Sequence, residues 1–337
     1  MATSHFSMWP GTERKHVRSQ GVPAMAPLKY HAGQRAVQEE ARTVEVADGL
    51  ADWVGPVTQF AGEADLIVMA VTPNSGRLEF GVLSGPPPLV RALGPTDDAP
   101  QLTEFELSEE ASLPPGPVGG LAISMQTARR ARFNGEVPAG NRPTVVVASE
   151  AFTNCRKYVV PSAIIGDDRF FGPESRTTID LADPAFADLI ARAETAFLAT
   201  VSPDGIPDVS HRGGPPGFLQ LDAVLREIKW PEYVGDGMLK SAGNLRSTGI
   251  FTLLIPDFES GDAVEICGRG DYVNTRPERR PRRDPLIQHR EPFPLQGEIG
   301  GEALEAFRLT RALHRRERIA GRERFTSKSA IGEQAPQ

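Results

Sequence analysis

The segment from Ser210 to Gly214, with the sequence SHRGG, brings together the residue types that proteins use to bind anions. Ser210 offers a hydroxyl, His211 and Arg212 offer N–H donors, and Gly213 and Gly214 free the backbone amides for close approach. The segment follows an apolar run and a tight turn, and two prolines come directly after it. It predicts either a loop shaped to hold an anion or an ordinary strand end with an exposed Arg and His.

Three polar residues further along the chain could close the same site. Lys240, Ser241 and Asn244 lie in the stretch VGDGMLKSAGNLRSTG, which predicts a loop followed by a short helix. A Lys side chain binds a phosphate as a point charge, and hydroxyl and amide groups add hydrogen bonds. Lys240, Ser241 and Asn244 are therefore candidates to close the anion site of Arg212.

A similar segment without the charges stands far upstream. The hairpin sequence LIVMAVTPNSGRLEFGVLSGPPP aligns with FLATVSPDGIPDVSHRGGPP, so that Pro203 corresponds to Pro73, 130 positions earlier. Leu83 stands where the second segment has Arg212, now 129 positions earlier. Each hairpin follows a helical stretch and precedes two more strands, which predicts two copies of one domain packed about a pseudo-two-fold axis. The first copy lacks the cation, so we expect it to complete one wall of the second copy's cleft.

The elements expected to position this site are mostly short strands. Alternating or continuous apolar runs predict strands at 65–72, 77–85, 121–127, 131–137, 143–152, 197–202, 206–214, 250–256 and 263–273. Helices are predicted at 30–43 and 54–64, and at 183–197, where Asp183 is the N-cap and Pro184 the first helical residue. The pattern of residues 301–321 predicts one more helix, which Gly321 ends. The fold class is therefore mainly β with short α-helices.

Composition limits the function classes. The 337-residue chain carries a net charge of −7 with 33 Gly and 30 Pro, which favours short elements and many turns. From Arg276 onward, 14 Lys/Arg face 9 Asp/Glu, so that this tail is basic and the body acidic. The tail's arginines predict a solvated face, because no aromatic platform accompanies them, and we expect no nucleic-acid partner.

The chain shows no signature of a metal site, a disulfide framework or a membrane segment. Its two cysteines, Cys155 and Cys267, have no CxxC spacing, and the six histidines have no ligand spacing. The N-terminal residues lack the apolar stretch of a signal peptide, and LIVMAV is too short to span a bilayer. We expect a soluble cytoplasmic protein without a metal and without a membrane partner, in a reducing compartment.

Taken together, these motifs resemble the flavin-binding split-barrel proteins related to pyridoxamine 5′-phosphate oxidase, and more narrowly their bacterial two-barrel members. The resemblance rests on FLATVSPDGIPDVSHRGGPPGF, on Tyr30-His31-Ala32-Gly33 with Ala36-Val37-Gln38, and on Ala151-Phe152-Thr153-Asn154-Cys155 with Tyr158. It covers most of residues 30–275. Ala32 stands where the family usually has an acidic residue, the C-terminal Arg/Trp signature of true pyridoxamine phosphate oxidases is absent, and residues 276–337 differ from the usual end. These departures argue against the classical vitamin B6 reaction.

The resemblance implies two fused FMN-binding split β-barrels of Greek-key type. Its domain plan is a disordered N-terminus at 1–28, a degenerate first half at 29–162, an FMN-binding second half at 163–275, and a basic, partly disordered tail with one helix at 276–337. The FMN phosphate would lie near Arg212 and Lys240, and the flavin ring along the strand with Thr200, Val201 and Ser202. The resemblance thus implies one FMN near the pseudo-dimer interface, and a homodimer of the whole chain stays open.

No residue is predicted to be catalytic. Asn154 and Cys155 are marked by the family pattern, but a lone Cys at a strand end is more often buried packing than a nucleophile. We expect His31 to be a surface or capping residue in preference to a substrate-side group. We expect Cys267 to be a core residue. With FMN bound, hydride transfer at flavin N5 would act on an unidentified small molecule. The alternatives are a flavin-binding protein without turnover, such as a sensor or carrier, and a reductase that uses the deazaflavin F420.

Overall fold

The structure is a computed structural model that describes residues 28–51, 55–73, 76–93, 103–140, 142–275 and 295–319. Its helices are α1 (Ala32–Ala41), α2 (Val44–Ala51), α3 (Val57–Gly62), α4 (Pro184–Arg192) and α5 (Lys240–Thr248). The first half contains β1 (Leu66–Val71), β2 (Glu79–Ser84), β3 (Val90–Leu93), β4 (Thr103–Leu107), β5 (Gly116–Ser124), β6 (Arg129–Val137) and β7 (Val145–Thr153). Short strands follow as β8 (Ser162–Ile164), β9 (Phe170–Gly172) and β10 (Ser175–Thr178). The second half contains β11 (Thr195–Val201), β12 (Pro207–Gly213), β13 (Gln220–Asp222), β14 (Glu227–Tyr233), β15 (Ile250–Pro256), β16 (Ala263–Val273), β17 (Leu295–Thr310) and β18 (Arg316–Arg318).

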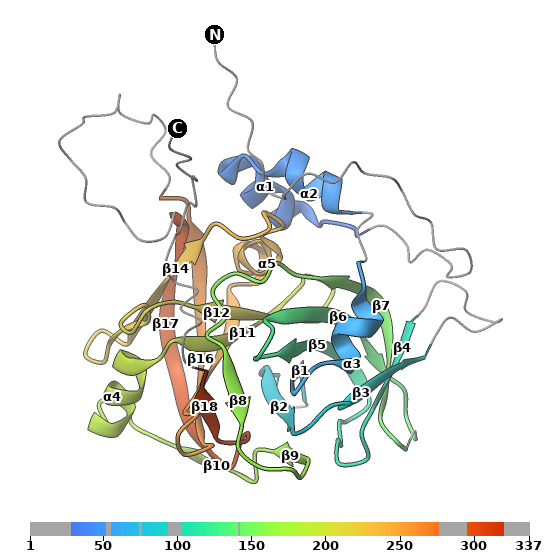
Figure 1. The fold of residues 1–337 in the computed structure, drawn as a ribbon. Coiled ribbons are helices and arrows are strands. Elements are labelled where there is room, and N and C mark those ends of the chain that lie inside the picture. Colours follow the sequence, from blue (N-terminus) through green and yellow to red (C-terminus); the bar gives the residue numbers. More distant parts are fainter. Residues whose placement is uncertain are drawn as a thin grey trace, which may run out of the picture.

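Two large antiparallel sheets have the same strand order, and β18 and β8 pair separately. The first sheet runs β3-β4-β7-β6-β5-β1-β2 and ends on β9, and the second runs β13-β14-β17-β16-β15-β11-β12, with β10 pairing beside β17. The first seven strands of the two halves therefore correspond one to one. The two sheets lie side by side, with α1, α2 and α5 at one end of the molecule (Figure 1). The mainly β class is confirmed, and the shared order is what two copies of one domain would give.

The register of the two hairpins agrees with the sequence alignment. Leu66 pairs with Ser84 in the first sheet, and Thr195 pairs with Gly213 in the second, so that both partners are displaced by 129 positions. One hydrogen bond beyond each hairpin repeats as well, since Gly85 N donates to the carbonyl of Asp65, and Gly214 N donates to that of Glu194. The alignment of Leu83 with Arg212 is therefore also a structural correspondence.

The central strands of the two sheets are buried on both faces, which explains why their sequences are continuously apolar. In β1, Ile67 and Met69 face the core of the first half, whereas Leu66 and Val68 join a cluster shared by both halves. In β11, Leu198 faces the core of the second half, while neighbouring residues join the shared cluster. The shared cluster joins the two halves, because it contains buried residues from both sheets.

The predicted helix before the second hairpin is present as α4. Asp183 accepts a hydrogen bond from Ala185 N at 2.8 Å, and Pro184 occupies the first helical turn. Phe186, Leu189 and Ile190 are its buried side chains. The helix packs over the second half because its apolar residues recur three and four positions apart.

Replacing Asp183 by alanine is expected to lower the free energy of unfolding by about 1 kcal/mol, because an orphan amide of α4 loses its acceptor. The Asp188→Ala variant is the matched control, since Asp188 lies on the same helix with a 74% exposed side chain. Urea titration followed by circular dichroism measures both. An Asp183→Ala variant as stable as the wild type would show that the cap contributes nothing.

The helix predicted at 301–321 is wrong. Residues 295–310 form β17, which pairs with β16 on one side and with β14 on the other. Ile299, Ala303 and Leu309 on this strand are buried. Arg316 on β18 is buried too and pairs with Asp65 of the first half at 2.9 Å. The residues 295–319 are therefore part of the folded second half and not part of a tail; residues 1–27, 276–294 and 320–337 lie outside the described residues.

Candidate anion-binding site

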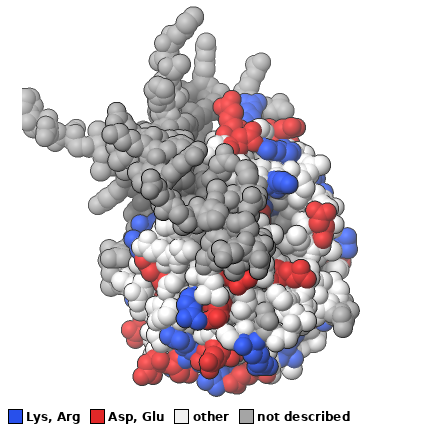
Figure 2. Space-filling model, turned by 90° about the vertical axis from the view of Figure 1, so that its right-hand side faces the viewer, with Lys and Arg blue, Asp and Glu red and all other residues white. Residues whose placement is uncertain are grey.

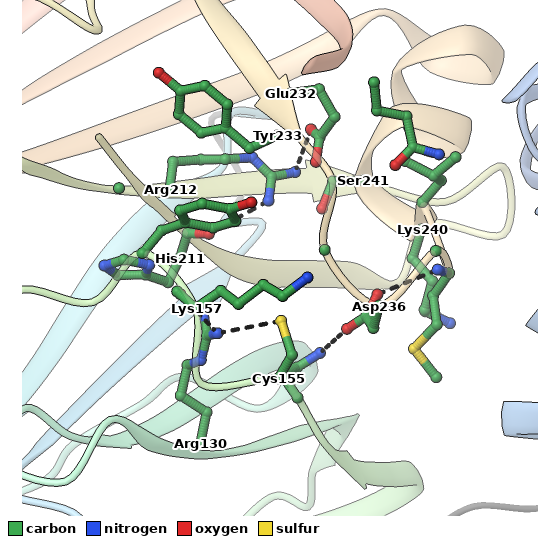
Figure 3. Close-up of a pocket in the computed structure, with 18 of the residues that line it drawn as sticks. Arg130, Cys155, Lys157, His211, Arg212, Glu232, Tyr233, Asp236, Lys240 and Ser241 are labelled. Atoms are coloured by element: carbon green, nitrogen blue, oxygen red, sulfur yellow. Dashed lines mark hydrogen bonds and ion pairs between the residues drawn. The ribbon is translucent and has the colours of Figure 1, made fainter. Parts of the chain in front are cut away.

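A cavity of about 90 Å³ lies where the two halves meet. The first half contributes Arg130 and Arg132 on β6 and the turn after β7, which carries Cys155 and Tyr158. The second half contributes the end of β12, the end of β14 and the loop that leads into α5. Figure 3 shows Arg212 and Arg130 on either side of His211, with Lys240 across the cavity. The cavity is thus built jointly by residues far apart in sequence.

Cationic side chains dominate the lining. Among the described residues around the cavity they are Arg130, Arg132, Lys157, Arg212 and Lys240. Three of the five have carboxylate partners: Arg132 with Asp208 at 3.2 Å, Arg212 with Glu232 at 3.1 Å, and Lys240 with Glu150 at 2.9 Å. Arg130 donates to Cys155 Sγ at 3.7 Å and to a backbone carbonyl at 3.2 Å, and Lys157 donates to the carbonyl of Val234 at 3.2 Å. These two cations bind neutral acceptors.

Several buried polar atoms around the cavity have no hydrogen-bond partner within the described protein. They are the Nε atoms of Arg130, Arg132 and Arg212, both ring nitrogens of His211, Oδ1 of Asn154 and Oε2 of Glu232. A buried donor without a partner costs about 1–3 kcal/mol, so such groups normally face a ligand or water. Five of these seven atoms are nitrogens, and the three arginine nitrogens are all donors. The cavity therefore suits a ligand group rich in acceptor oxygens.

His211 is neutral in this setting. Burial holds the pKa of His211 well below 6.5, and the positive charges of Arg130 and Arg212 lower it further. The ring packs edge-on against Phe197 with 5.7 Å between centroids. A neutral imidazole has one N–H donor and one acceptor nitrogen. His211 therefore adds a hydrogen bond to the site without adding charge.

Gly213 permits the close approach of the two halves at this point. A Cβ atom at Gly213 would lie 1.9 Å from the carbonyl oxygen of Tyr158. The hydroxyl of Tyr158 in turn donates to the carbonyl of Val234 at 2.9 Å. Gly213 thus allows the turn after β7 to pack directly on β12, which closes one side of the cavity.

The predicted site residues fall into two groups. His211, Arg212, Gly213, Lys240 and Ser241 line the cavity. The others, which are Thr200, Val201, Ser202, Ser210 and Asn244, do not line it. The structure brings together the charged residues of the prediction, and it places the expected ring-binding strand residues elsewhere.

The second group has structural partners of its own. Asn244 donates to Thr200 Oγ1 at 3.0 Å, and its Oδ1 accepts from His31 at 2.8 Å and from Gln34 at 3.0 Å. The hydroxyls of Ser210 and Ser241 lie 2.9 Å apart. These bonds fasten α1 and α5 to the second sheet. His31 is the N-cap of α1, which confirms its prediction as a capping residue.

The turn at the tip of the second hairpin holds the remaining two. Ser202 Oγ accepts from Ile206 N at 3.2 Å, and the carbonyl of Val201 accepts from Thr248 at 3.1 Å. Both interactions are local packing of the turn and of α5.

The corresponding place in the first half is filled by the chain itself. Leu83 and Ser84 stand at the positions of Arg212 and Gly213, and both are buried. Ser84 Oγ lies 3.0 Å from His314 Nδ1, and His314 Nε2 lies 3.0 Å from Asp168. The first copy thus has no cation at this position, as expected, and His314 packs there instead.

Several cavity residues were not predicted from the sequence. They are Arg130, Arg132, Lys157, Glu232 and Asp236, together with Asp208 and Glu150 behind them. A signal for the first two exists in RRARFNG, since Arg130 and Arg132 alternate with Ala131 and Phe133 in a strand whose other face is core. Charged residues on the second face of a buried strand indicate a buried polar interface.

Cys155 lines the cavity, whereas Cys267 is buried in β16 as predicted. Burial raises the pKa of Cys155, and the charge of Arg130 opposes that shift. The thiol is therefore protonated at neutral pH and not an activated nucleophile. The described residues contain no cluster of His, Cys, Asp and Glu that could hold a metal ion.

The charge at the surface differs from that in the cavity. On the face shown in Figure 2, positive and negative side chains are interspersed among the described residues.

No helix within the described ranges is long and apolar enough to cross a membrane.

Comparisons with known proteins found similarity to solved structures. No family model matches the chain, and no curated protein matches it. HupZ from Group A Streptococcus is 20% identical with a TM-score of 0.27, over 37% of this chain and 98% of its own. A proposed pyridoxamine 5′-phosphate oxidase from Lactobacillus delbrueckii is 20% identical with a TM-score of 0.28, over 39% and 98%. An F420 reductase is 16% identical with a TM-score of 0.22, over 36% and 91%. Similarity this low carries neither a ligand nor a reaction over to this chain.

Proposed function

We propose that the protein binds FMN through its phosphate in the cavity between the halves and acts as an FMN-dependent oxidoreductase on a small molecule. The observation that carries this proposal is the buried cluster of Arg130, Arg212 and His211 with ring and guanidinium nitrogens that have no partner among the described residues. Phosphate groups are bound by such arrays of charge-assisted donors.

The residues fit the phosphate end of FMN. Arg212 and Arg130 can donate from two sides, and His211 and Ser241 add neutral hydrogen bonds from the same wall. The first residues of α5 also face the cavity, and no side chain caps that helix. Its N-terminal amides therefore add donors and a favourable dipole for an anion.

The cavity itself does not enclose the flavin ring. Sites that bury a ligand of this size usually measure about 300–1,000 Å³, whereas this cavity measures about 90 Å³. The proposal therefore assigns the phosphate to the cavity and places the ring outside it. The sequence-based position along Thr200, Val201 and Ser202 stays a prediction.

The protein's share of the chemistry is binding and orientation. When bound, FMN supplies hydride transfer at N5. Arg130 and Arg212 would fix the phosphate from two different halves, and His211 would remain neutral and donate one hydrogen bond. Cys155, as a protonated thiol at the same wall, would keep the site free of a further negative charge.

FMN and riboflavin together test this function, because riboflavin has the same ring without the phosphate. We expect FMN to bind, measured by the change in flavin fluorescence, and riboflavin to bind at least about 30-fold more weakly, as the loss of about 2 kcal/mol of charged contacts implies. Mass spectrometry of the ligand that copurifies identifies FMN or F420 directly. Reduction of the bound flavin by NAD(P)H or a small substrate distinguishes an enzyme from a carrier. Equal affinity for FMN and riboflavin would overturn the phosphate assignment.

A further inference from the structure

We propose that Glu232 is an internal competitor for Arg212, so that a dianionic ligand displaces it and binds together with one proton. The inference rests on the proposed function, because it assumes that an anion binds beside Arg212. It concerns a residue on β14 that no sequence motif marked. Figure 3 shows the Glu232 carboxylate directed at the Arg212 guanidinium.

The contact between these two side chains is close but poorly directed. Glu232 Oε2 lies 3.1 Å from Arg212 Nη2, yet that oxygen makes no hydrogen bond of acceptable geometry within the described protein. The Nε of Arg212 is also without a partner. A guanidinium binds a carboxylate or phosphate best through two parallel N–H donors. A phosphate that uses both would therefore replace Glu232 readily.

The charges around the cavity favour the uptake of a proton. Five cationic side chains meet four carboxylates, namely Glu232, Asp236, Asp208 and Glu150, which leaves one positive charge. A bound dianion would turn this into one buried negative charge, which is costly at low dielectric. One added proton restores neutrality.

Glu232 is well placed to take that proton. The groups that face it are Arg212 on β12, Arg132 on β6, Asp236 in the loop before α5 and Tyr158 in the turn after β7. Burial already raises the pKa of Glu232, with Arg212 and Arg132 opposing and Asp236 adding to the shift. Once a ligand occupies Arg212, that opposing charge is neutralised and the pKa rises further.

The sign of the pH dependence follows. Below the pKa of Glu232 in the free protein the carboxyl is already protonated, and affinity does not depend on its titration. Above that value, and below the higher pKa in the complex, binding takes up a proton, so that affinity falls as pH rises by up to about tenfold per pH unit.

Sulfate is the probe for this test, because it stays a dianion throughout, whereas the phosphate of FMN itself titrates near about pH 6. Calorimetric titration of sulfate into the full chain over a pH series gives the affinity. Repeating it in two buffers of different ionisation enthalpy counts the protons taken up by the wild-type protein. We expect about one proton in the range where affinity falls.

Two variants complete the experiment. Glu232→Gln removes the titrating carboxylate at nearly constant shape, and we expect it to bind sulfate at least about tenfold more tightly at the alkaline end, with a flat pH profile. Glu227→Gln, on the same strand with a 47% exposed side chain, should behave as the wild type. Thermal unfolding checks that both variants fold, and the wild-type proton count stands without either.

The outcomes separate the two proposals. Sulfate binding with no proton uptake, or a pH profile retained in Glu232→Gln, overturns the role of Glu232 and leaves phosphate binding intact. If neither sulfate nor FMN binds to the wild-type chain, the proposed function fails and this inference falls with it.

Discussion

The Arg212→Ala variant is expected to bind FMN at least about 30-fold more weakly than the wild type, with an affinity close to that for riboflavin. Removing one partner from a buried, charged hydrogen-bonded pair costs about 2–5 kcal/mol. Arg212 and Arg130 flank the proposed phosphate position, and the side chain of Arg212 is only 16% exposed. Riboflavin affinity should not change, because riboflavin lacks the group that Arg212 contacts. Fluorescence titration with both flavins measures this difference.

A matched arginine controls for general effects of the substitution. Arg91 lies on β3 with a 70% exposed side chain and pairs with Glu106 at the surface. The Arg91→Ala variant should bind FMN as the wild type does, since surface ion pairs contribute about 0–1 kcal/mol. Unaltered FMN affinity in Arg212→Ala would show that the phosphate lies elsewhere. Circular dichroism establishes that the variant is folded.

A chain that ends at Thr275 is expected to lose the fold of its second half. Strand β17 lies between β16 and β14, so that its removal detaches β14 and β13 from the sheet. The buried side chains of Ile299 and Leu309 alone contribute about 3–6 kcal/mol, at about 1.5–3 kcal/mol each. A domain's net stability is only about 5–15 kcal/mol. Thermal unfolding should therefore show no cooperative transition for this half.

The control for that truncation ends at Ile319 and keeps every strand pairing described above, including β18 with β8. It should unfold at nearly the temperature of the full chain and bind FMN with the same affinity. A Thr275 truncation that unfolds like the Ile319 truncation would contradict the position of β17 in the sheet.

The sequence predicted the elements whose local pattern matches their environment. The runs LIVMAV and FLATV became β1 and β11, and the Asp183-Pro184 pair marked the start of α4 correctly. The register of the two hairpins followed from the repeat. These features depend on neighbouring residues, so that a single sequence contains enough information to predict them.

The helix prediction at 301–321 failed because of an irregularity in the strand. The register of β17 against β16 shifts at Cys267/Gly268, where Ala303 and Glu305 are successive partners and Leu304 is left out. Leu304 is 44% exposed, whereas Ala303 and Ala306 are both buried. A bulge thus places buried residues three apart and imitates helical spacing. Pairing with two distant strands decided the structure, and no local pattern records that pairing.

The sequence predicted only part of the candidate site, because tertiary packing brings the other residues to it. Arg212 and Lys240 stood out because each follows a recognisable turn or strand end in the charged copy. Arg130 was missed because it lies in the copy that lacks the motif, 82 positions before Arg212. Its place beside His211 results from the packing of β6 against β12, which belong to different halves. Only the tertiary arrangement brings these cations together.

The two matching sheets belong to one chain, and this determines how ligand affinity depends on the protein concentration. A site built between two separate subunits is lost on dilution, because its halves dissociate by mass action. Here Arg130 and Arg212 of the cavity belong to one covalent chain, and each half meets the other at a fixed, high effective concentration. Ligand affinity should therefore be the same in a dilute and a concentrated solution of the protein. The covalent link also lets Leu83 and Arg212 differ at equivalent positions, which a symmetric dimer of identical subunits cannot do.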